Sequence, residues 1–130
     1  MKILVVDDDK TTRKILSLYL KGKGYEVVTA ENGLDALEKM GTENINLVLT
    51  DMNMPFMDGI ELTKTLKADP NWKHIPILMV TTEADEEEKK RAATAGVDDY
   101  LVKPANAEQV TASVKKILKK MFSSGGGSGV

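Results

Sequence analysis

The feature that most constrains the fold is a regular alternation of short apolar runs with longer stretches of helical spacing. Five runs are rich in branched residues and too short to form helices. They are Ile3 to Val6, Val27 to Ala30, Leu47 to Leu49, Ile77 to Val80 and Tyr100 to Val102. Each run is predicted to be a strand. Their nearly continuous apolarity is typical of a parallel sheet that helices cover on both faces.

The stretches between and after these runs are predicted to be helices. The clearest is the last, where apolar residues recur at steps of three and four and therefore form one stripe. These residues are Val110, Val114, Ile117, Leu118 and Met121. Three helices are expected to begin at a capping residue that is followed three positions later by Glu or Gln. These caps are Asp58, Asp85 and Asn106, with Asp9 as the cap of the first helix. Three glycines, Gly22, Gly41 and Gly96, are expected to end helices.

Strand and helix alternate five times within 130 residues, which is the usual size of one domain. Such an alternation predicts an α/β fold, in which right-handed crossovers connect a mostly parallel sheet. We expect this domain to occupy residues 1–121. Residues 122–130, from Phe122 through a run of Ser and Gly to Val130, are expected to form a flexible tail, either an expression scar or a natural linker.

Composition excludes several classes of function. The chain has no cysteine, so it has neither disulfides nor thiolate chemistry. Its net charge of -2 does not suit a nucleic-acid binder. The apolar run at the N-terminus is too short for a signal peptide or a membrane span, so a cytoplasmic location without membrane contact is expected. Neither the glycine pattern of dinucleotide sites nor a Walker-type phosphate loop is present.

Polar residues with complementary charges follow four of the predicted strands. Asp7 and Asp8 come after the first, Asp51 after the third, Thr81 after the fourth and Lys103 after the fifth. In an open parallel sheet these ends share one edge, where ligands bind. Three carboxylates form an oxygen site of the kind that Mg²⁺ prefers. Two carboxylates about 5 Å apart repel by roughly 3 kcal/mol at an effective dielectric near 20, which is enough to raise one pKa or to recruit a cation, and Lys103 supplies a compensating charge.

Four motifs in order carry a resemblance to a known family. They are Val5-Val6-Asp7-Asp8, the segment from Asp51 to Gly59 with the sequence DMNMPFMDG, Val80-Thr81, and the segment from Tyr100 to Pro104 with the sequence YLVKP. From Lys2 to about Met121 the chain resembles the receiver domains of two-component response regulators, and among them the small chemotaxis-type regulators. The resemblance implies a flavodoxin-like (βα)5 fold with strand order 2-1-3-4-5.

The resemblance also implies roles for single residues. Asp51 is then the phosphoacceptor, and Asp8 and Asp51 bind Mg²⁺ directly. Asp7 acts through metal-bound water, and the backbone carbonyl of Asn53 completes the protein ligands.

Further residues carry roles that the same resemblance implies. Thr81 and Lys103 hold the phosphoryl oxygens, and Tyr100 is the aromatic residue whose burial follows Thr81. The Lys103–Pro104 bond is expected to be cis. Asn53 and Glu83 match positions that tune the loss of the phosphate.

The function implied is a phosphorylation-driven switch rather than an enzyme, with self-phosphorylation and autodephosphorylation chemistry of its own. A histidine kinase or a small phosphodonor supplies the phosphoryl group, and hydrolysis resets the switch. The fourth helix, fifth strand and fifth helix change their surface for an unknown downstream protein. The fourth helix, from about Asp85 to Ala95, has mostly alanine on its apolar side and is expected to be a weakly held element. The unphosphorylated protein is expected to be a monomer.

Other readings of these residues remain open. The segment Val6-Asp7-Asp8-Asp9-Lys10-Thr11 also fits the start of haloacid-dehalogenase-like phosphatases, in which the first Asp, here Asp7, is phosphorylated. The chain could also be a receiver from a longer regulator, or one that signals without phosphate. Thr82 and Ala105 depart from the chemotaxis pattern near the expected output face, so the resemblance does not imply a flagellar-motor partner.

Two basic features are interpreted without a chemical role. His74, the only histidine, has no neighbours with metal-ligand spacing. Four lysines of the last helix, Lys115, Lys116, Lys119 and Lys120, are interpreted as a solvated face that could also meet a partner.

Overall fold

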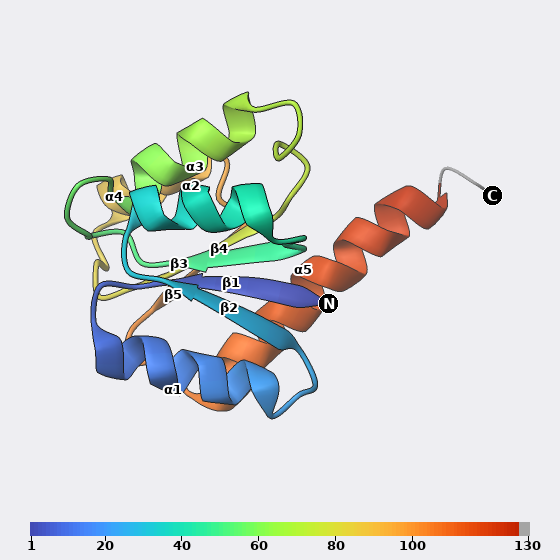
Figure 1. Cartoon of the computed structure of the whole chain (residues 1–130), viewed down its shortest axis with the longest axis horizontal. Coiled ribbons are helices and arrows are strands. Elements are labelled where there is room, and N and C mark those ends of the chain that lie inside the picture. Colours follow the sequence, from blue (N-terminus) through green and yellow to red (C-terminus); the bar gives the residue numbers. More distant parts are fainter. Residues whose placement is uncertain (128–130) are drawn as a thin grey trace.

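The computed structural model describes residues 1–127 as a five-stranded parallel sheet flanked by five helices (Figure 1). The strands are β1 (Lys2–Val6), β2 (Glu26–Ala30), β3 (Leu47–Thr50), β4 (Ile77–Thr81) and β5 (Asp99–Val102). They lie in the order β2-β1-β3-β4-β5, and every neighbouring pair is parallel. This confirms the predicted fold class and strand order.

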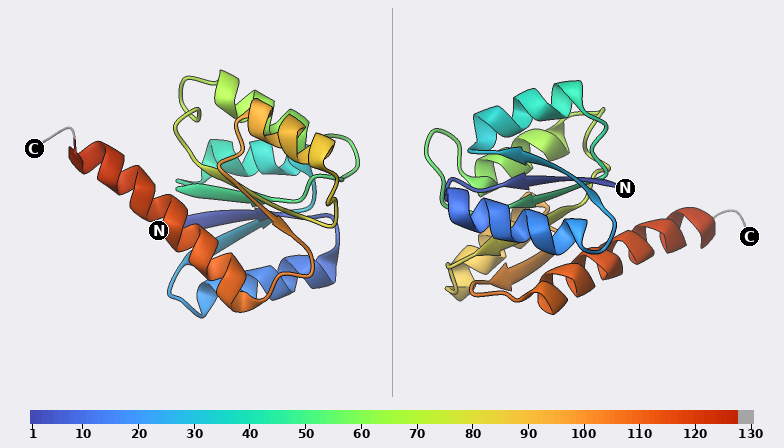
Figure 2. Two further views of the ribbon diagram at one scale, coloured as in Figure 1. Left: turned by 180° about the vertical axis from the view of Figure 1, so that it is seen from behind. Right: turned by 60° about the horizontal axis from the view of Figure 1, so that its bottom comes forward.

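The helices cover both faces of the sheet. They are α1 (Lys10–Lys21), α2 (Gly33–Thr42), α3 (Gly59–Ala68), α4 (Glu86–Ala95) and α5 (Ala107–Gly127). Helices α1 and α5 lie on one face, whereas α2, α3 and α4 lie on the other (Figures 1 and 2). None of the helices described is long and apolar enough to cross a membrane.

Alternate residues of the central strands point into two different cores. In β1, Ile3 and Val5 join the cluster beneath α1 and α5, whereas Leu4 and Val6 join the cluster beneath α2 and α3. All side chains of β3 and β4 are buried. Burial on both faces explains why these strands read as unbroken apolar runs.

The predicted N-caps all bind the backbone of the turn that follows, although not in the same way. Asn106 and Gln109 form a complete capping box, because each side chain accepts a hydrogen bond from the other's backbone N–H, at 2.8 and 2.9 Å. Asp58 accepts from the N–H of Glu61, and Asp9 from that of Thr12. Asp85 accepts from Glu87, one residue earlier than the predicted Glu88.

Two predicted helix ends differ from the structure. Gly22 and Gly96 are C-caps as expected, and Gly96 has the left-handed φ of 115° that favours glycine. Gly41, however, lies inside α2, which ends only at the C-cap Glu43. The prediction was wrong because one helical glycine costs only about 1 kcal/mol relative to alanine, which the packing of α2 against the sheet overrides.

The C-terminal helix continues beyond the end predicted for the domain. Helix α5 runs to Gly127, so the backbone of 122–127 is helical where a tail was expected. Residues added to an existing helix need no new nucleus, which lets a helix extend into a sequence of low propensity. Residues 128–130 lie outside the described residues, and a domain boundary near Met121 stays a prediction.

Candidate functional site

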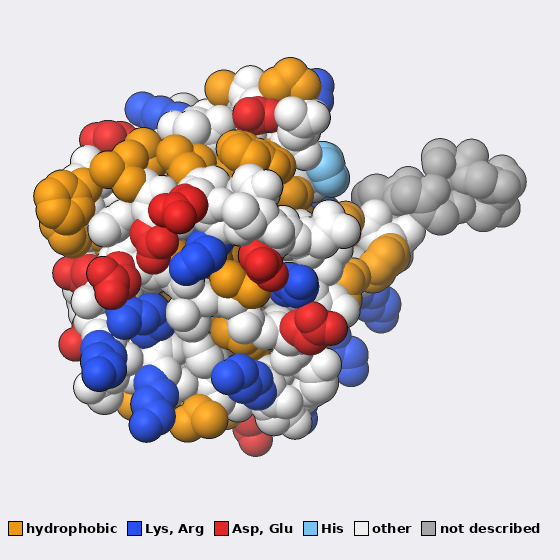
Figure 3. Space-filling model, viewed as in Figure 1, with side chains coloured by type: hydrophobic (Ala, Val, Ile, Leu, Met, Phe, Trp, Pro, Cys, Tyr) orange, Lys and Arg blue, Asp and Glu red, His pale blue; other side chains and the backbone are white. Residues whose placement is uncertain are grey.

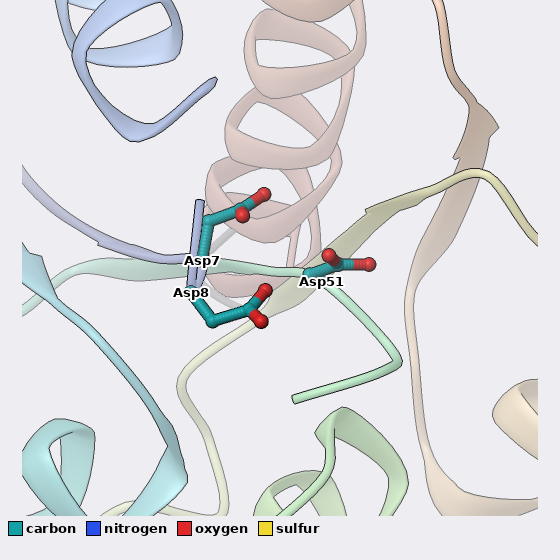
Figure 4. A group of neighbouring side chains, drawn as sticks. All are labelled: Asp7, Asp8 and Asp51. Atoms are coloured by element: carbon teal, nitrogen blue, oxygen red, sulfur yellow. The ribbon is translucent and has the colours of Figure 1, made fainter. Parts of the chain in front are cut away.

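Three aspartates meet at the carboxyl edge of the sheet. Asp7 directly follows β1 and Asp51 directly follows β3, and these neighbouring strands end with Val6 paired to Thr50. Carboxylate oxygens of Asp7, Asp8 and Asp51 all lie within 4.8 Å of one another, and Figure 4 shows the three side chains projecting from adjacent chain segments. Asp7 and Asp51 are buried, at 1% and 8% exposure, whereas Asp8 is exposed. The site is therefore closed at its base and open at Asp8.

Lys103 links the two buried carboxylates. Its Nζ lies 2.8 Å from Oδ2 of Asp7 and 3.3 Å from Oδ2 of Asp51. Because β4 separates β3 from β5, only a long side chain can reach from the end of β5 to Asp51. The backbone N–H of Lys103 donates to the carbonyl of Thr81 at 2.8 Å, and the Lys103–Pro104 bond is cis as expected.

Backbone hydrogen bonds fix the position of Asp51. Its N–H donates to the carbonyl of Val6 at 2.9 Å, and its Oδ1 accepts from the N–H of Met52 at 2.7 Å. The N–H of Gly59, where α3 begins, donates to the carbonyl of Met52 at 2.7 Å. A Cβ at Gly59 would overlap the carbonyl oxygen of Asp51. Glycine at this position therefore allows the β3–α3 loop to close against Asp51.

Arg13 is a further member of the site that the sequence did not reveal. Its Nη1 donates to the backbone carbonyl of Asp7 at 2.7 Å, and Oδ1 of Asp7 accepts from the N–H of Asp9 at 2.9 Å. These contacts hold the turn between β1 and α1. An arginine near the start of a helix has no pattern that distinguishes it from a solvated one, so no sequence signal could have identified it.

The electrostatics of the site favour the binding of a cation. Burial raises the pKa of the Asp7 carboxyl, and the nearby charge of Asp51 raises it too, although the hydrogen bond from Lys103 opposes this. Burial alone would lower the pKa of Lys103, but its hydrogen bond to Asp7 and the charges of Asp51 and Asp7 raise it overall. The pKa of Asp7 is thus raised mainly by its burial, and that of Lys103 by its two carboxylate partners, Asp7 and Asp51.

The donor set fits a hard divalent cation. Every side-chain donor of the cluster is a carboxylate oxygen, as Mg²⁺ prefers, and no softer ligand is among them. Asn53 is exposed and lies two residues beyond Asp51 in the loop that leaves the site. The metal role of its carbonyl stays a prediction.

The residues predicted to switch are connected through Glu83. Thr81 is fully buried, and its hydroxyl accepts a hydrogen bond from the N–H of Glu83 at 3.3 Å. The hydroxyl of Tyr100 donates to the carbonyl of Glu83 at 2.6 Å. Burial, followed by the charge of Glu83, raises the pKa of Tyr100 to about 12. Tyr100 thus ties β5 to the loop between β4 and α4.

The two departures from the chemotaxis pattern lie together beside this site. Thr82 and Ala105 line a groove of about 430 Å³ between α1 and the β5–α5 loop, and Ile15 and Lys103 also line it. Its lining is mainly apolar, and Lys103 reaches from it to the carboxylates. The departures therefore lie at the surface next to the site and not within the carboxylate cluster.

Comparisons with known proteins agree with this geometry. The family model described as "Response regulator receiver domain" matches residues 3–115. Chemotaxis protein CheY-3 of Vibrio cholerae is 42% identical over 122 residues, which cover 93% of this chain and 94% of the relative. Chemotaxis protein CheY of Pseudomonas aeruginosa is 40% identical over 122 residues, which cover 93% of this chain and 98% of the relative.

Solved structures show the same likeness. The chemotaxis response regulator CheY4 of Vibrio cholerae has a TM-score of 0.84 at 37% identity, covering 89% of this chain and 97% of that one. A CheY-like receiver domain protein from Methanospirillum hungatei has a TM-score of 0.88 at 31% identity, covering 95% of this chain and 97% of that one. The family model matches most of the chain, and the strand order is the one that the resemblance implied. The chain therefore belongs to the response regulator receiver domains.

Proposed function

We propose that the protein is a two-component signalling switch in which Asp51 accepts a phosphoryl group with the help of Mg²⁺. One observation carries this proposal. The Asp51 carboxylate lies within 4.8 Å of two further carboxylates and 3.3 Å from the ammonium group of Lys103, so potential metal ligands and a fixed cation are both next to it. The proposed receiver domain ends near Met121, before the Gly/Ser-rich segment.

The proposed reaction is a transfer of the phosphoryl group to a carboxylate oxygen of Asp51. This oxygen attacks phosphorus while the bond to the donor breaks, either P–N in a phosphohistidine or P–O in a small phosphodonor, and an acyl phosphate forms. Mg²⁺, when bound by Asp7, Asp8, Asp51 and the carbonyl of Asn53, supplies neutralising charge to the phosphoryl oxygens. Lys103 contributes a second, fixed positive charge.

Loss of the phosphoryl group resets the proposed switch. Water attacks phosphorus, the bond to Asp51 breaks, and the carboxylate and inorganic phosphate are released. We assign the tuning of this step to Asn53 and Glu83, as the resemblance to receiver domains implies. Besides Mg²⁺, the first step needs only the phosphodonor, and the second needs only water.

The signal would leave the site through Thr81. The Thr81 hydroxyl can donate a hydrogen bond to a phosphoryl oxygen, which would draw it away from the N–H of Glu83. Because Tyr100 binds the carbonyl of the same Glu83, this movement would change the surface formed by α4, β5 and α5. The proposed partners are a histidine kinase and a downstream protein at this surface. Because relatives of the chain are named chemotaxis proteins, we place the proposed switch in a chemotaxis-like signalling pathway.

A phosphatase that uses Asp7 as its nucleophile fits the structure less well. The Asp7 side chain is more deeply buried than that of Asp51, at 1% against 8% exposure, and its Oδ2 lies closer to Nζ of Lys103, at 2.8 Å against 3.3 Å. Asp51 and Lys103, which follow later strands, belong to the Asp51 site, whereas Asp98 and Asp99 lie at the start of β5 and bind Ile77 and Ser113.

Labelling with radioactive acetyl phosphate tests the acceptor. Wild-type protein with Mg²⁺ is expected to take up acid-stable, base-labile label, Asp51→Asn to lose it, and removal of Mg²⁺ with EDTA to abolish it. Asp7→Asn is expected to keep Asp51 as the labelled residue. Label at the wild-type level on Asp51→Asn would contradict the proposal, and its loss on Asp7→Asn with no effect of Asp51→Asn would support the phosphatase.

A separate measurement tests whether phosphate changes the surface. Beryllofluoride, which mimics an aspartyl phosphate, is expected to shift the backbone NMR signals of Thr81, Glu83 and Tyr100 when Mg²⁺ is present. Unchanged signals at millimolar beryllofluoride would favour a receiver that signals without phosphate.

A further inference from the structure

A second cleft lies at the edge of the sheet opposite to the carboxylates. It has a volume of about 330 Å³ and lies between α5 and the connection from α3 to β4. Pro76 immediately precedes β4 and Asp98 immediately precedes β5, so the cleft is at the amino ends of these strands. The phosphoacceptor site uses the carboxyl ends. The cleft is therefore separate from the phosphoacceptor site, although α5 also contributes to the proposed output surface.

The cleft carries an excess of basic groups. Lys67, His74, Lys116 and Lys120 line it, against one acid, Asp98. That acid is already engaged, because its Oδ2 lies 3.6 Å from Nζ of Lys67 and accepts from the N–H of Ile77 at 2.8 Å.

The two lysines of α5 keep their charge available. Lys116 and Lys120 are exposed, and neither forms an ion pair with any residue in the described part of the chain. A few basic side chains are visible on the lower side of α5 in the space-filling view (Figure 3). Because Lys116 and Lys120 line the cleft and keep their charge available, its rim is positive in a protein whose net charge is -2.

The inner part of the cleft is well packed and partly apolar. Nζ of Lys67 donates to the carbonyl of Ile75 at 3.0 Å, and a Cβ at Gly96 would stand 3.0 Å from the Lys67 side chain. Pro76 and Ile117 are buried, and Met121 is half-buried, so all three offer apolar surface. An occupant therefore meets apolar surface within the cleft and lysines at the rim.

These features favour a peptide over a small anion. Small phosphates are bound by converging backbone N–H groups or at a helix N-terminus. Here the free cations are on flexible stems in the middle of α5, away from the unpaired backbone N–H groups of the helix N-terminus. A volume near 330 Å³ is at the small end of ligand pockets and suits one or two side chains.

We propose that this cleft binds an acidic peptide segment of a partner protein. One apolar side chain of the peptide contacts Ile117 and Met121, and flanking carboxylates pair with Lys116 and Lys120. Charge complementarity identifies the partner: it is acidic and carries an apolar residue among its acids.

Fluorescence anisotropy of the full chain with a labelled synthetic peptide, Glu-Asp-Leu-Glu-Asp, tests this proposal at low ionic strength. Lys116→Gln/Lys120→Gln is expected to weaken binding about fivefold, because two ion pairs are lost. The matched control is Lys115→Gln/Lys119→Gln, which removes the same charge from the same helix outside the cleft. It is expected to change the affinity less than about twofold. All four positions are exposed, and circular dichroism checks that both variants fold.

Two further arms separate this site from general attraction of anions. A peptide with Ser in place of Leu is expected to bind more weakly, and inorganic pyrophosphate is expected to displace the labelled peptide poorly. The proposal is overturned by an absence of saturable binding, by equal weakening in the two double variants, or by pyrophosphate competing as well as unlabelled peptide. Acetyl phosphate labelling of Asp51 is measured in parallel and is expected to be the same in both variants, so the two proposals succeed or fail separately.

Discussion

The side chain of Tyr100 contacts the loop between β4 and α4, so its environment depends on the position of that loop. Its hydroxyl donates to the carbonyl of Glu83 at 2.6 Å, and Nζ of Lys89 lies 5.9 Å from the centre of its ring. The phenol is therefore held by a neutral hydrogen bond and by a cation, both of which come from the segment that the proposed switch moves. Any movement of Glu83 changes the environment of Tyr100.

The pKa of Tyr100 yields a prediction at high pH. It is raised from 10.0 to about 12 by burial and then by the charge of Glu83, so the folded state keeps this proton where the unfolded state loses it. The contribution of Tyr100 to stability is therefore complete below the unfolded pKa and is lost as pH rises toward about 12. In an absorbance titration of the tyrosines, Tyr100→Phe is expected to remove the phenol that ionises last. Removal of an earlier-ionising phenol would contradict this assignment.

The β3–α3 loop packs closely against its surroundings because glycines stand at two neighbouring helix starts. Gly59 allows α3 to begin directly against Asp51, and Gly33 at the start of α2 plays a similar part. A Cβ at Gly33 would stand 2.6 Å from Cγ of Met57 in the same loop. Two helix starts therefore enclose the loop that follows the proposed phosphoacceptor.

Opposite effects are expected when two glycines are replaced by alanine. Gly59→Ala should lower the free energy of unfolding by about 1–3 kcal/mol, because its Cβ overlaps the Asp51 backbone. It should also slow acetyl phosphate labelling. Gly41→Ala should raise the free energy of unfolding by about 0.5–1 kcal/mol, because Gly41 is in a helix and its Cβ would meet nothing within 4 Å. Urea denaturation measures both, and equal effects of the two changes would argue against this account.

Helix α4 is the least anchored of the described helices. Ala92 is its only buried residue, whereas α3 buries Gly59, Ile60, Leu62, Thr63 and Leu66. Hydrogen exchange is expected to be at least about tenfold faster for the interior amides of α4 than for those of α3, because little apolar surface opposes its opening. Slower exchange in α4 than in α3 would refute the expectation that α4 is a weakly held element.

For the whole molecule, the carboxylate cluster predicts stabilisation by Mg²⁺. The cation would bind the folded cluster and not the unfolded chain, so a concentration 100 times the dissociation constant should add about 2.7 kcal/mol to the free energy of unfolding. Asp8→Asn is expected to remove most of this gain, because it takes away one of the three carboxylates that would hold the ion. Thermal melting with and without MgCl₂ measures it. Asp98→Asn, a change of the same kind away from the cluster, is expected to keep the gain.

Charge is divided unevenly over the whole molecule. Acids gather around the carboxyl ends of the strands and in the first turn of α4, whereas four lysines follow the outer side of α5. The net charge of -2 conceals this division because the two groups nearly cancel. A protein with two such poles can meet a phosphodonor and an acidic partner at separate surfaces.

Local patterns were enough to predict the elements, their order and the carboxylate site. Apolar runs buried on both faces must be central strands, and parallel strands bring their ends to one edge, so Asp7, Asp51, Thr81 and Lys103 could be placed together from the sequence. The resemblance to receiver domains supplied the strand order. Helix ends were less predictable, as Gly41 and the length of α5 show, because they depend on differences of about 1 kcal/mol.

Only the tertiary structure decided which side chains touch. The contact of Arg13 with the Asp7 carbonyl, that of Tyr100 with Glu83, and the basic cleft at Lys116 all join residues whose spacing carries no pattern. The physical reason is that a helix or strand buries side chains at regular intervals, so its burial appears in the sequence as a periodic pattern of apolar residues. A single contact between distant segments depends on how whole elements pack and leaves no such trace.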